Sequence, residues 1–230
     1  LRVLLFELLP VCYLEGFKEL KKIVNQQPWP KSPKFIFTSN SFGTDEIFKM
    51  YAAIKTENGA KYYIAQHGNG YFTDRHGNPR IDELTADKFL TWGWNNKLPK
   101  YIPMFVFKAS GKLINYNNKG GLLLIEQPQY PRYSLWYKSC EFLNYFENQK
   151  KFVSQLAQGP KQKLIIRLSS SVFNIKLNET SRWLDFDRSL KIDDGKAKIR
   201  DLITDSRLVI HSYDSTGLLE TFSQNIPTLA

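Results

Sequence analysis

Small hydroxyl residues stand directly after an apolar run in residues 208–220. The apolar run predicts a buried strand, and the polar residues behind it predict a turn and the start of a helix. A helix N-terminus offers free N–H groups and the positive end of the helix dipole to a phosphate. Ser215 and Thr216 can add hydroxyl donors, and Gly217 lets a ligand approach the backbone closely. This stretch therefore predicts a phosphate cradle.

A carboxylate and a tyrosine flank this predicted cradle. Glu220 follows Thr216 by four residues, so it lies one turn deeper on the same helical face. There it can accept hydrogen bonds from the hydroxyls of a sugar, and Tyr213 is expected to line the same cleft. The simpler interpretation is that Ser215 and Thr216 only cap a helix and that Glu220 is a surface charge.

A histidine ends the strand that the sequence predicts at 61–66. His67 is followed by Gly68, Asn69 and Gly70, which are expected to line a cleft. A residue at the carboxyl end of a parallel strand lies at the sheet edge where ligands bind. Histidine is also the side chain best suited to take a proton from an attacking hydroxyl near neutral pH. His67 is therefore a candidate catalytic base, and the alternative is a histidine that only caps a strand end.

Four further polar residues follow predicted strands. Loops after strands line the ligand cleft in open α/β sheets, which makes Asn40 and Ser41 candidate cleft residues. Arg132 and Arg167 are candidate contacts for the phosphates of a donor, because arginine pairs well with phosphate. The alternative for Asn40 and Ser41 is that they only form the loop that connects a strand to the next helix. The alternative for Arg132 is that it is a surface charge.

Composition limits the class of protein. Hydrophobic residues make up 42% and aromatic residues 14% of the 230 positions, which excludes a disordered chain. No apolar run approaches the roughly 18 residues that a membrane span needs. The net charge of +10 indicates an anionic partner, and no nucleic-acid-binding motif is present, so no nucleic acid is expected. Cys12 and Cys140 lie far apart, so we expect no metal site and a cytoplasmic location.

Strand and helix patterns alternate on both sides of a segment rich in Asn, Gly and Lys at 117–121, which predicts an α/β fold. We expect one domain over residues 1–117 and another over 118–230. The chain has no initial Met and ends directly after a predicted strand, so we expect a fragment of a longer protein.

The sequence predicts strands at 34–38, 61–66, 87–94, 101–108, 122–126, 163–168 and 208–210. It predicts helices at 14–24, 44–58, 137–158 and 196–204, and irregular structure at 172–195.

Two groups of proteins share these motifs. Residues 213–220 and 225–227 resemble the donor-site motif of bacterial CDP-glycerol glycerophosphotransferases, a strand followed by Asp-Tyr-Ser-Ser-x-x-x-Asp and a short helix ending in Lys-Pro. The whole chain more closely resembles transferases of bacterial surface-carbohydrate synthesis. The sequences of that group carry similar QHG, TWGW, HSYDSTG and NIPTL motifs, found here at 66–68, 91–94, 211–217 and 225–229.

The resemblance implies the GT-B architecture, in which two Rossmann-like domains face each other across a cleft. It implies an N-terminal acceptor side with His67 as the base, and a C-terminal side that binds a nucleotide-activated donor. A sugar or polyol-phosphate unit would pass to a hydroxyl of a carbohydrate or lipid-linked acceptor. Phe72 stands where the glycerophosphotransferases carry a lysine, and this departure concerns acceptor contacts.

The resemblance also bears on cofactors, location and alternatives. No metal or other cofactor is implied, and the protein is expected in the cytoplasm, with a peripheral contact to the acidic inner face of the plasma membrane as a further option. Two other functions stay open at this stage. They are a non-catalytic module that binds a nucleotide sugar or polysaccharide, and a basic protein that binds nucleic acid.

Overall fold

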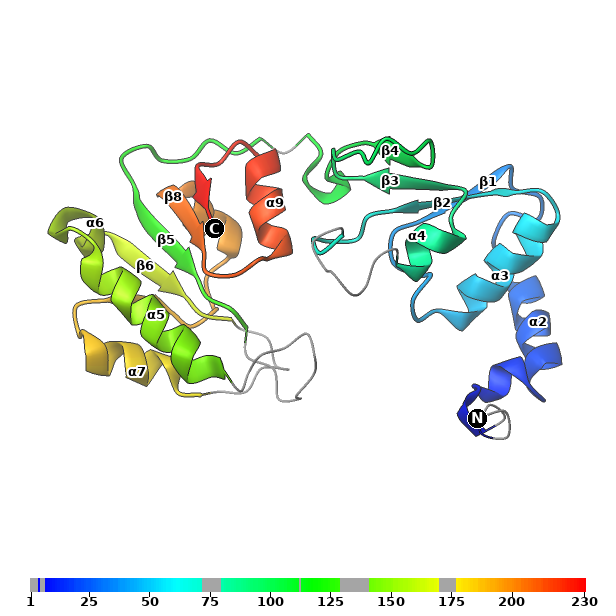
Figure 1. Cartoon of the computed structure of the whole chain (residues 1–230), viewed down its shortest axis with the longest axis horizontal. Helices are drawn as coiled ribbons and strands as arrows, with labels where there is room; N and C mark the ends of the chain where they lie inside the picture. Colours follow the sequence, from blue (N-terminus) through cyan, green and yellow to red (C-terminus); the bar gives the residue numbers. More distant parts are fainter. Residues whose placement is uncertain (1–3, 5–6, 72–79, 112, 129–140, 170–176) are drawn as a thin grey trace. The chain divides into compact units, whose positions relative to one another are not determined.

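The computed structural model describes residues 4, 7–71, 80–111, 113–128, 141–169 and 177–230. The chain divides into two compact units, Leu1–Phe105 and Val106–Ala230. Each unit has its own parallel β-sheet, and no described strand of one sheet pairs with a strand of the other (Figure 1). The class is α/β, with parallel sheets and helices of the Rossmann-like kind.

The sheet of the first unit has four parallel strands in the order β1-β2-β3-β4. The strands are β1 (Phe35–Thr38), β2 (Lys61–Ala65), β3 (Lys88–Thr91) and β4 (Tyr101–Pro103). These bounds confirm the predicted strands at 34–38, 61–66 and, in a shorter form, 87–94. The run at 101–108 is only partly extended, because a 3-10 turn, η2 (Phe107–Ala109), follows β4.

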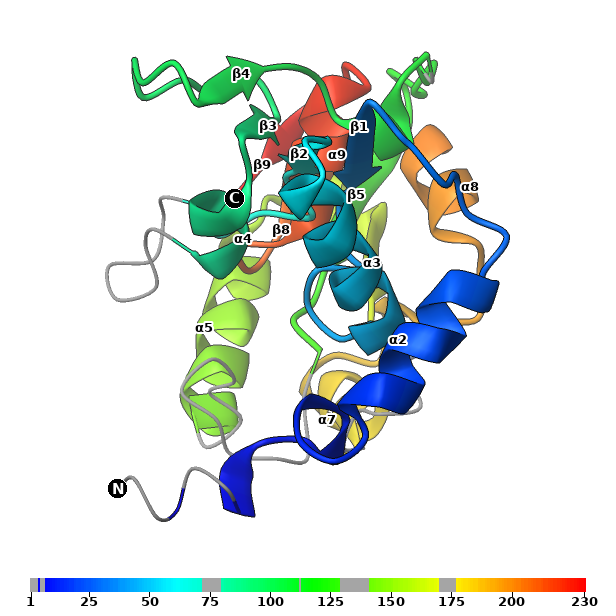
Figure 2. The ribbon, with the colours of Figure 1, turned by 90° about the vertical axis from the view of Figure 1, so that its right-hand side faces the viewer.

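The helices that lie wholly within the described residues of this unit are η1 (Val11–Tyr13), α2 (Phe17–Gln26), α3 (Glu46–Glu57) and α4 (Ile81–Thr85). The Asp45 side chain starts α3 by accepting the Phe48 N–H at 2.9 Å. Helix α2 packs along α3 through Leu20 and Val24 (Figure 2). The sequence did not predict α4, whose apolar residues are exposed while Asp82 and Glu83 are buried.

The second unit is built on a five-stranded parallel sheet in the order β7-β6-β5-β8-β9 (Figure 1). Its strands are β5 (Gly121–Ile125), β6 (Leu164–Arg167), β7 (Lys191–Asp193), β8 (Ser206–His211) and β9 (Thr228–Leu229). The chain starts in the centre with β5, moves to one side through β6 and β7, and then continues on the other side with β8. This is the 3-2-1-4-5 order of a doubly wound Rossmann sheet, with its switch point between β5 and β8.

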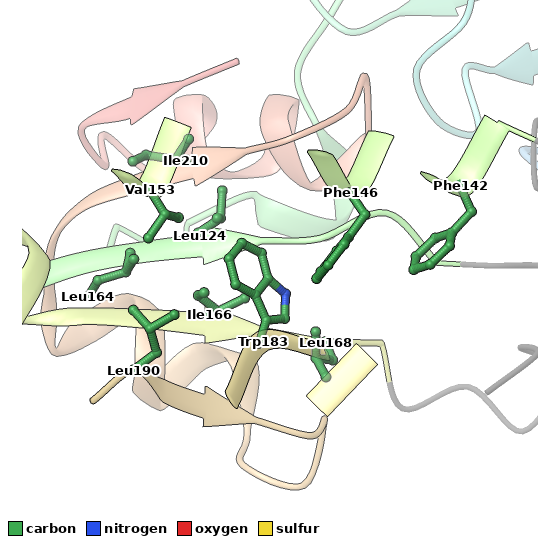
Figure 3. Close-up of a cluster of buried hydrophobic side chains, with 10 residues drawn as sticks. All are labelled: Leu124, Phe142, Phe146, Val153, Leu164, Ile166, Leu168, Trp183, Leu190 and Ile210. Atoms are coloured by element: carbon green, nitrogen blue, oxygen red, sulfur yellow. The ribbon is translucent and has the colours of Figure 1, made fainter. Parts of the chain in front are cut away.

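Helices cover both faces of this second sheet. They are α5 (Phe142–Gln155), α6 (Gln158–Gln162), α7 (Glu179–Phe186), α8 (Ile199–Thr204) and α9 (Thr216–Ser223). Leu124 points into a core with α5 and α7, where Trp183 is fully buried (Figure 3). Its neighbour Leu123 points to the opposite face, into a core with Ile203 of α8. The alternation of a strand therefore supplies two apolar layers from one Leu-rich run.

Two expectations for this unit were wrong in detail. The region 172–195 is not irregular, since α7 and β7 lie within its described part. Trp183 holds the short α7 in place by packing edge to face on Phe146, with ring centroids 5.0 Å apart. The single helix predicted at 137–158 ends as α5 at Gln155, because the next two residues are extended before α6 starts.

The segment at 117–121 is not a loose linker. The Asn117 N–H donates to the Thr204 carbonyl at 2.8 Å. A Cβ on Gly120 would lie 2.2 Å from the Asp205 oxygen, and one on Gly121 would lie 1.9 Å from the Lys163 oxygen. These glycines therefore serve close backbone approach. The compact units divide between residues 105 and 106, not between 117 and 118 as expected, because the segment from 106 packs with the second unit.

Candidate functional site: a pocket at the switch point of the second sheet

The predicted strand, turn and helix around residues 208–220 are present as β8 and α9. Ser215 caps α9 because its Oγ accepts the Leu218 N–H at 3.2 Å. Thr216 is the first residue of the helix and is half-buried. The N-terminus of α9 is thus built as the sequence predicts, with Ser215 in the capping position.

A buried histidine lies behind this cap. His211 ends β8 and is only 3% exposed, and burial lowers the pKa of its imidazole. Its Nδ1 lies 3.0 Å from Ser215 Oγ, and its Nε2 lies 3.5 Å from Thr221 Oγ1. Thr221 Oγ1 donates to the Leu218 carbonyl, so it accepts from Nε2–H. In this tautomer the Ser215 hydroxyl donates to Nδ1, so the hydroxyl proton already forms a hydrogen bond within the protein.

Gly217 is required by the same histidine. A Cβ at this position would lie 3.0 Å from His211 Cε1, which is closer than nearly all such contacts in proteins. The absent side chain therefore lets α9 pack against the imidazole. The sequence explained Gly217 by the approach of a ligand, and the structure adds a packing reason of its own.

A pocket of about 260 Å³ opens where β5, β6 and β8 end. This is the carboxyl edge at the switch point, where open α/β sheets bind their ligands. Predicted site residues that line it are Arg167, Tyr213, Ser215, Gly217 and Glu220. Polar lining residues that the sequence did not single out are Glu126, Ser169, His211, Thr221 and Gln224. Thr216 belongs to the same helix start but not to the lining.

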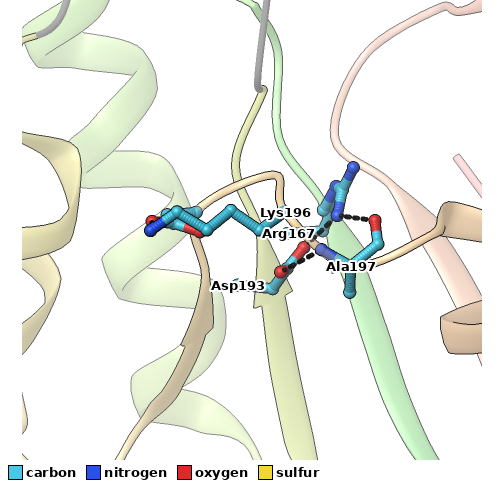
Figure 4. A network of polar contacts seen from close by, with 5 residues as sticks. Arg167, Asp193, Lys196 and Ala197 are labelled. Atoms are coloured by element: carbon cyan, nitrogen blue, oxygen red, sulfur yellow. Dashed lines mark hydrogen bonds and ion pairs between the residues drawn. The ribbon is translucent and has the colours of Figure 1, made fainter.

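The positive charge of Arg167 is already engaged. Its Nη1 forms an ion pair with the Asp193 carboxylate and donates to the Ala197 carbonyl at 2.7 Å (Figure 4). Asp193 in turn accepts the Ala197 N–H at 3.1 Å. The arginine thus ties the ends of β6 and β7 to the loop before α8. This structural role accompanies its place in the pocket lining.

Glu220 has a described partner. Its carboxylate accepts from Lys108 Nζ at 3.0 Å, and its side chain is 23% exposed. Lys108 belongs to η2, so the pair fixes η2 against α9. Glu220 is therefore neither an isolated surface charge nor fully buried. It lines the pocket on the side that α9 forms.

A hydrogen-bond network joins the strand ends on the other side of the sheet. The Tyr145 hydroxyl accepts the Gln127 N–H at 2.8 Å and lies 2.6 Å from Ser212 Oγ. Ser212 Oγ donates to the Ile125 carbonyl at 2.8 Å. Burial raises the pKa of the Tyr145 hydroxyl, so it stays neutral. The ends of β5 and β8 are thus held together by α5.

In the first unit, His67 is exposed and follows β2, as the sequence predicts. The buried Gln66 fixes this loop, because its Nε2 donates to the Gly68 carbonyl at 2.7 Å. Its Oε1 accepts from Trp92 N at 2.9 Å and Trp94 Nε1 at 2.8 Å. The amide therefore joins the loop after β2 to the loop after β3, and it explains why the QHG and TWGW motifs occur together.

The neighbouring loop residues have local explanations as well. The N–H groups of Asn40 and Ser41 both donate to Thr38 Oγ1, at 3.2 and 3.1 Å. These hydrogen bonds stabilise a turn after β1. Gly70 has a φ of 88°, which favours glycine, and Asn69 beside it is half-buried. All of these residues follow β1 or β2, at the carboxyl edge of the first sheet.

A larger pocket of about 670 Å³ in the first unit lies elsewhere. It is bounded by α3, α4 and residues at the start of β2 and β3, including Lys61 and Asp87. None of the predicted site residues lines it. Because ligands of open parallel sheets bind at the carboxyl ends of strands, this amino-end pocket is the weaker candidate site. Arg132 and Phe72 lie outside the described residues.

The fold and the switch-point pocket define an α/β protein with Rossmann-like sheets. The model of a family described as LIC12162 family transferase matches residues 1–230, so the chain belongs to this transferase family. Membership identifies the class of protein as an enzyme that transfers a group. No curated protein matches the chain. None of the helices in the described residues is long and apolar enough to cross a membrane.

Proposed function

We propose that the chain is a GT-B-type transferase, either a glycosyltransferase or a glycerophosphotransferase-like enzyme. It moves a sugar or polyol-phosphate unit from a nucleotide-activated donor to a hydroxyl of a bacterial surface carbohydrate. The observation that carries the proposal is the pocket at the switch point between β5 and β8, where nucleotides bind in doubly wound sheets. Membership of a transferase family favours a reaction over binding alone.

The second unit binds the donor in this proposal. Backbone N–H groups at the start of α9, with the Thr216 hydroxyl, hold the phosphates of the donor. Ser215 keeps the helix start in shape through its cap and its contact with His211. Glu220, from its position on the pocket wall, accepts hydrogen bonds from the ribose or the donor polyol. Arg167 adds positive charge close by, reduced by its pairing with Asp193.

The first unit binds the acceptor in this proposal. His67 takes the proton of the acceptor hydroxyl as its oxygen bonds to the transferred unit. The bond between this unit and the leaving nucleotide phosphate breaks in the same step. Negative charge develops on the departing phosphate, and the positive end of α9 stabilises it. No metal or other cofactor takes part, and the carbohydrate or lipid-linked acceptor is met in the cytoplasm or at the inner face of the plasma membrane.

Donor binding is tested with nucleotides on the full chain. Calorimetry with CDP, UDP, GDP and ADP should find one that binds, and Thr216→Val should weaken it by about 1–3 kcal/mol, the cost of losing a hydrogen bond to a charged group. Ser223→Ala is the matched control, because Ser223 is exposed at the far end of the same helix. A wild-type protein that binds none of the four would contradict a nucleotide donor. Equal affinities in wild type and Thr216→Val would leave Thr216 with a structural role only.

Catalysis by His67 is tested with the donor that this panel identifies. Its exposed side chain makes the exchange to alanine structurally mild, so His67→Ala should fold normally. Turnover should fall by about 10²–10⁴-fold, the range for one acid–base group, while donor affinity stays unchanged. Full turnover in the variant would move the base to another residue. Lost donor binding would assign His67 to the donor site.

A further inference from the structure

The buried imidazole of His211 lies on the pocket side of the second sheet. Side chains alternate along β8, and Ile210 packs into the core with α5 while Val209 packs into the core with α8. His211 therefore points to the same face as Val209. Its ring contacts agree with this, because it lies against Ser215 and Gly217 at the start of α9. His211 and both of these residues line the pocket of about 260 Å³.

Both nitrogens of this imidazole face hydroxyl groups. Nδ1 lies 3.0 Å from Ser215 Oγ, and Nε2 lies 3.5 Å from Thr221 Oγ1. A hydroxyl can accept as well as donate, so the same partners also suit a ring that carries a proton on each nitrogen. Within the described part of the chain, no carboxylate forms a hydrogen bond or ion pair with the ring. Protonation therefore costs no hydrogen bond, but the imidazolium lacks a negative charge as a partner.

The charged groups around His211 do not supply that partner. Arg167 at the end of β6 is paired with Asp193, and Glu220 of α9 is paired with Lys108. The other titratable groups on neighbouring segments are Glu126 after β5, and Tyr213 and Asp214 after β8, while α8 lines the pocket with Ile199 and Ile203 and β9 consists of Thr228 and Leu229. Burial lowers the pKa of the imidazole, and a negative charge brought by a ligand opposes that influence.

A proton on His211 changes what Ser215 offers to a ligand. Beside the neutral ring, the Ser215 hydroxyl donates to Nδ1 while its oxygen accepts the Leu218 N–H at 3.2 Å. A proton on Nδ1 reverses the first of these bonds, so Oγ accepts both and its own proton can point elsewhere. Ser215 is 7% exposed and lines the pocket, so an oxygen of a bound ligand can accept this proton. The imidazolium also places a positive charge against the first turn of α9.

We propose that His211 takes up a proton as the donor binds, and that the imidazolium and the released Ser215 hydroxyl both stabilise the diphosphate of the donor. The proton comes from solvent and bonds to Nδ1. This assignment rests on the proposed function and deepens it, because it makes His211 a positioning residue for Ser215 and a source of positive charge beside the phosphates. The alternative is a histidine that stays neutral and only packs against α9.

The first test measures protons that are exchanged when intact donors bind to the full chain. The probes are CDP-glycerol, UDP-glucose, GDP-mannose and ADP-glucose, whose diphosphate diesters gain no proton between pH 6 and 8. Calorimetry at pH 6.5 in two buffers of different ionisation enthalpy should find uptake of up to about one proton. A group whose pKa rises on binding favours binding at low pH, so affinity should increase by about threefold to tenfold from pH 8 to pH 6. Proton release, or no exchange with a donor that binds, overturns the assignment.

Two variants identify the group that takes up the proton. His211→Asn keeps an acceptor near the place of Nδ1 but does not titrate, so it should bind the donor without proton uptake. Its affinity should stay within about twofold of wild type at pH 8 and be about threefold to tenfold weaker at pH 6. Glu126→Gln is the matched control. Burial raises the pKa of Glu126 to about 7, but its carboxyl group lies near Trp183 and Glu179, so the uptake should remain. Loss of the uptake in Glu126→Gln would give the proton to Glu126 and refute the role of His211.

Nuclear magnetic resonance of histidine side chains decides the question even if His211→Asn does not fold. The chain has three histidines, and His67→Ala and His76→Ala assign the signals of the other two. The pKa of the His211 ring should lie below its ordinary value of 6.5 in the free protein, because the ring is buried, and above 6.5 with the donor bound. A His211 ring that stays neutral at pH 6 in the donor complex overturns the assignment.

The results also separate the two proposals. Donor binding with a neutral His211 refutes the role of His211 and leaves the proposed function standing. A wild-type chain that binds neither the four donors nor their diphosphates refutes the proposed function, and the role of His211 falls with it.

Discussion

Nδ1 of His211 lies 3.0 Å from Oγ of Ser215, the residue that caps α9. This contact joins the last residue of β8 to the first turn of the helix that follows. It uses the hydroxyl that the sequence assigns to a phosphate ligand. The start of α9 is therefore shaped by a buried imidazole, and in the proposed function the phosphate contacts fall to the backbone N–H groups and to Thr216.

Replacing this imidazole should destabilise the second unit. His211→Ala removes both ring contacts and leaves Ser215 and Thr221 with altered partners in a buried place. The free energy of unfolding should fall by about 2–4 kcal/mol, from the cavity and the lost hydrogen bonds together. Urea denaturation followed by circular dichroism measures this. His67→Ala, at an exposed histidine, is the control and should change stability by less than about 0.5 kcal/mol.

The contact between Gly217 and His211 predicts a second effect. Gly217→Ala places a methyl group 3.0 Å from His211 Cε1 and should cost about 1–3 kcal/mol through overpacking. Gly159→Ala is the matched control on α6, where an added Cβ meets no atom within 4 Å. This control should be neutral or stabilise the protein by up to about 1 kcal/mol. Equal stabilities of the two variants would show that α9 shifts without cost.

Local patterns predicted the central parts of the fold and one side of the site. The Leu-rich run of β5, the helical pattern of α3 and the start of α9 are signals that neighbours in sequence supply. The short α4 and α7 escaped prediction because a turn or two of helix carries too little periodicity. What holds α7 is the tertiary burial of Trp183.

The other side of the site depends on contacts between distant residues. Parallel pairing sets Ile125 opposite His211, which brings Glu126 to the end of β8. The residues in and around β5 and β8 do not by themselves indicate this register. A glutamate directly after a buried strand was the one available signal for Glu126. For Arg167, likewise, the pairing with Asp193 could not be read from the sequence, because β7 was not predicted.

The buried Gln66 predicts a joint response of two loops in the first unit. Gln66→Leu keeps much of the volume but removes three hydrogen bonds, to Gly68, Trp92 and Trp94. Stability should fall by about 2–4 kcal/mol, because buried backbone and indole groups lose their partners. Trp94 should also become more exposed, which shifts tryptophan emission to longer wavelength. Gln26→Leu, at an exposed glutamine on α2, is the control and should leave the emission unchanged.

The pH dependence of stability should carry the signature of Glu126. Burial raises its pKa to about 7 in the folded protein, from 4.5 in the unfolded chain. Between these values the folded state holds a proton that the unfolded state has lost. The contribution of Glu126 is therefore fully present below pH 4.5 and is lost as pH rises through 7, by up to about 3 kcal/mol. Burial lowers the pKa of His211, so its contribution has the opposite sign and is lost as pH falls below about 6.5.

Urea titrations from pH 4.5 to 8 separate these two influences. Glu126→Gln cannot ionise, so its stability relative to wild type should rise steadily as pH increases from 4.5 to 8. Glu147→Gln, at an exposed acid on α5, should follow the wild-type curve with a constant offset. His211→Ala should keep the loss of stability toward pH 8 and remove the loss toward acid that His211 causes. A Glu126→Gln curve parallel to wild type would mean that the carboxylate of Glu126 is ionised in the folded protein throughout this range, with a partner that stabilises its charge.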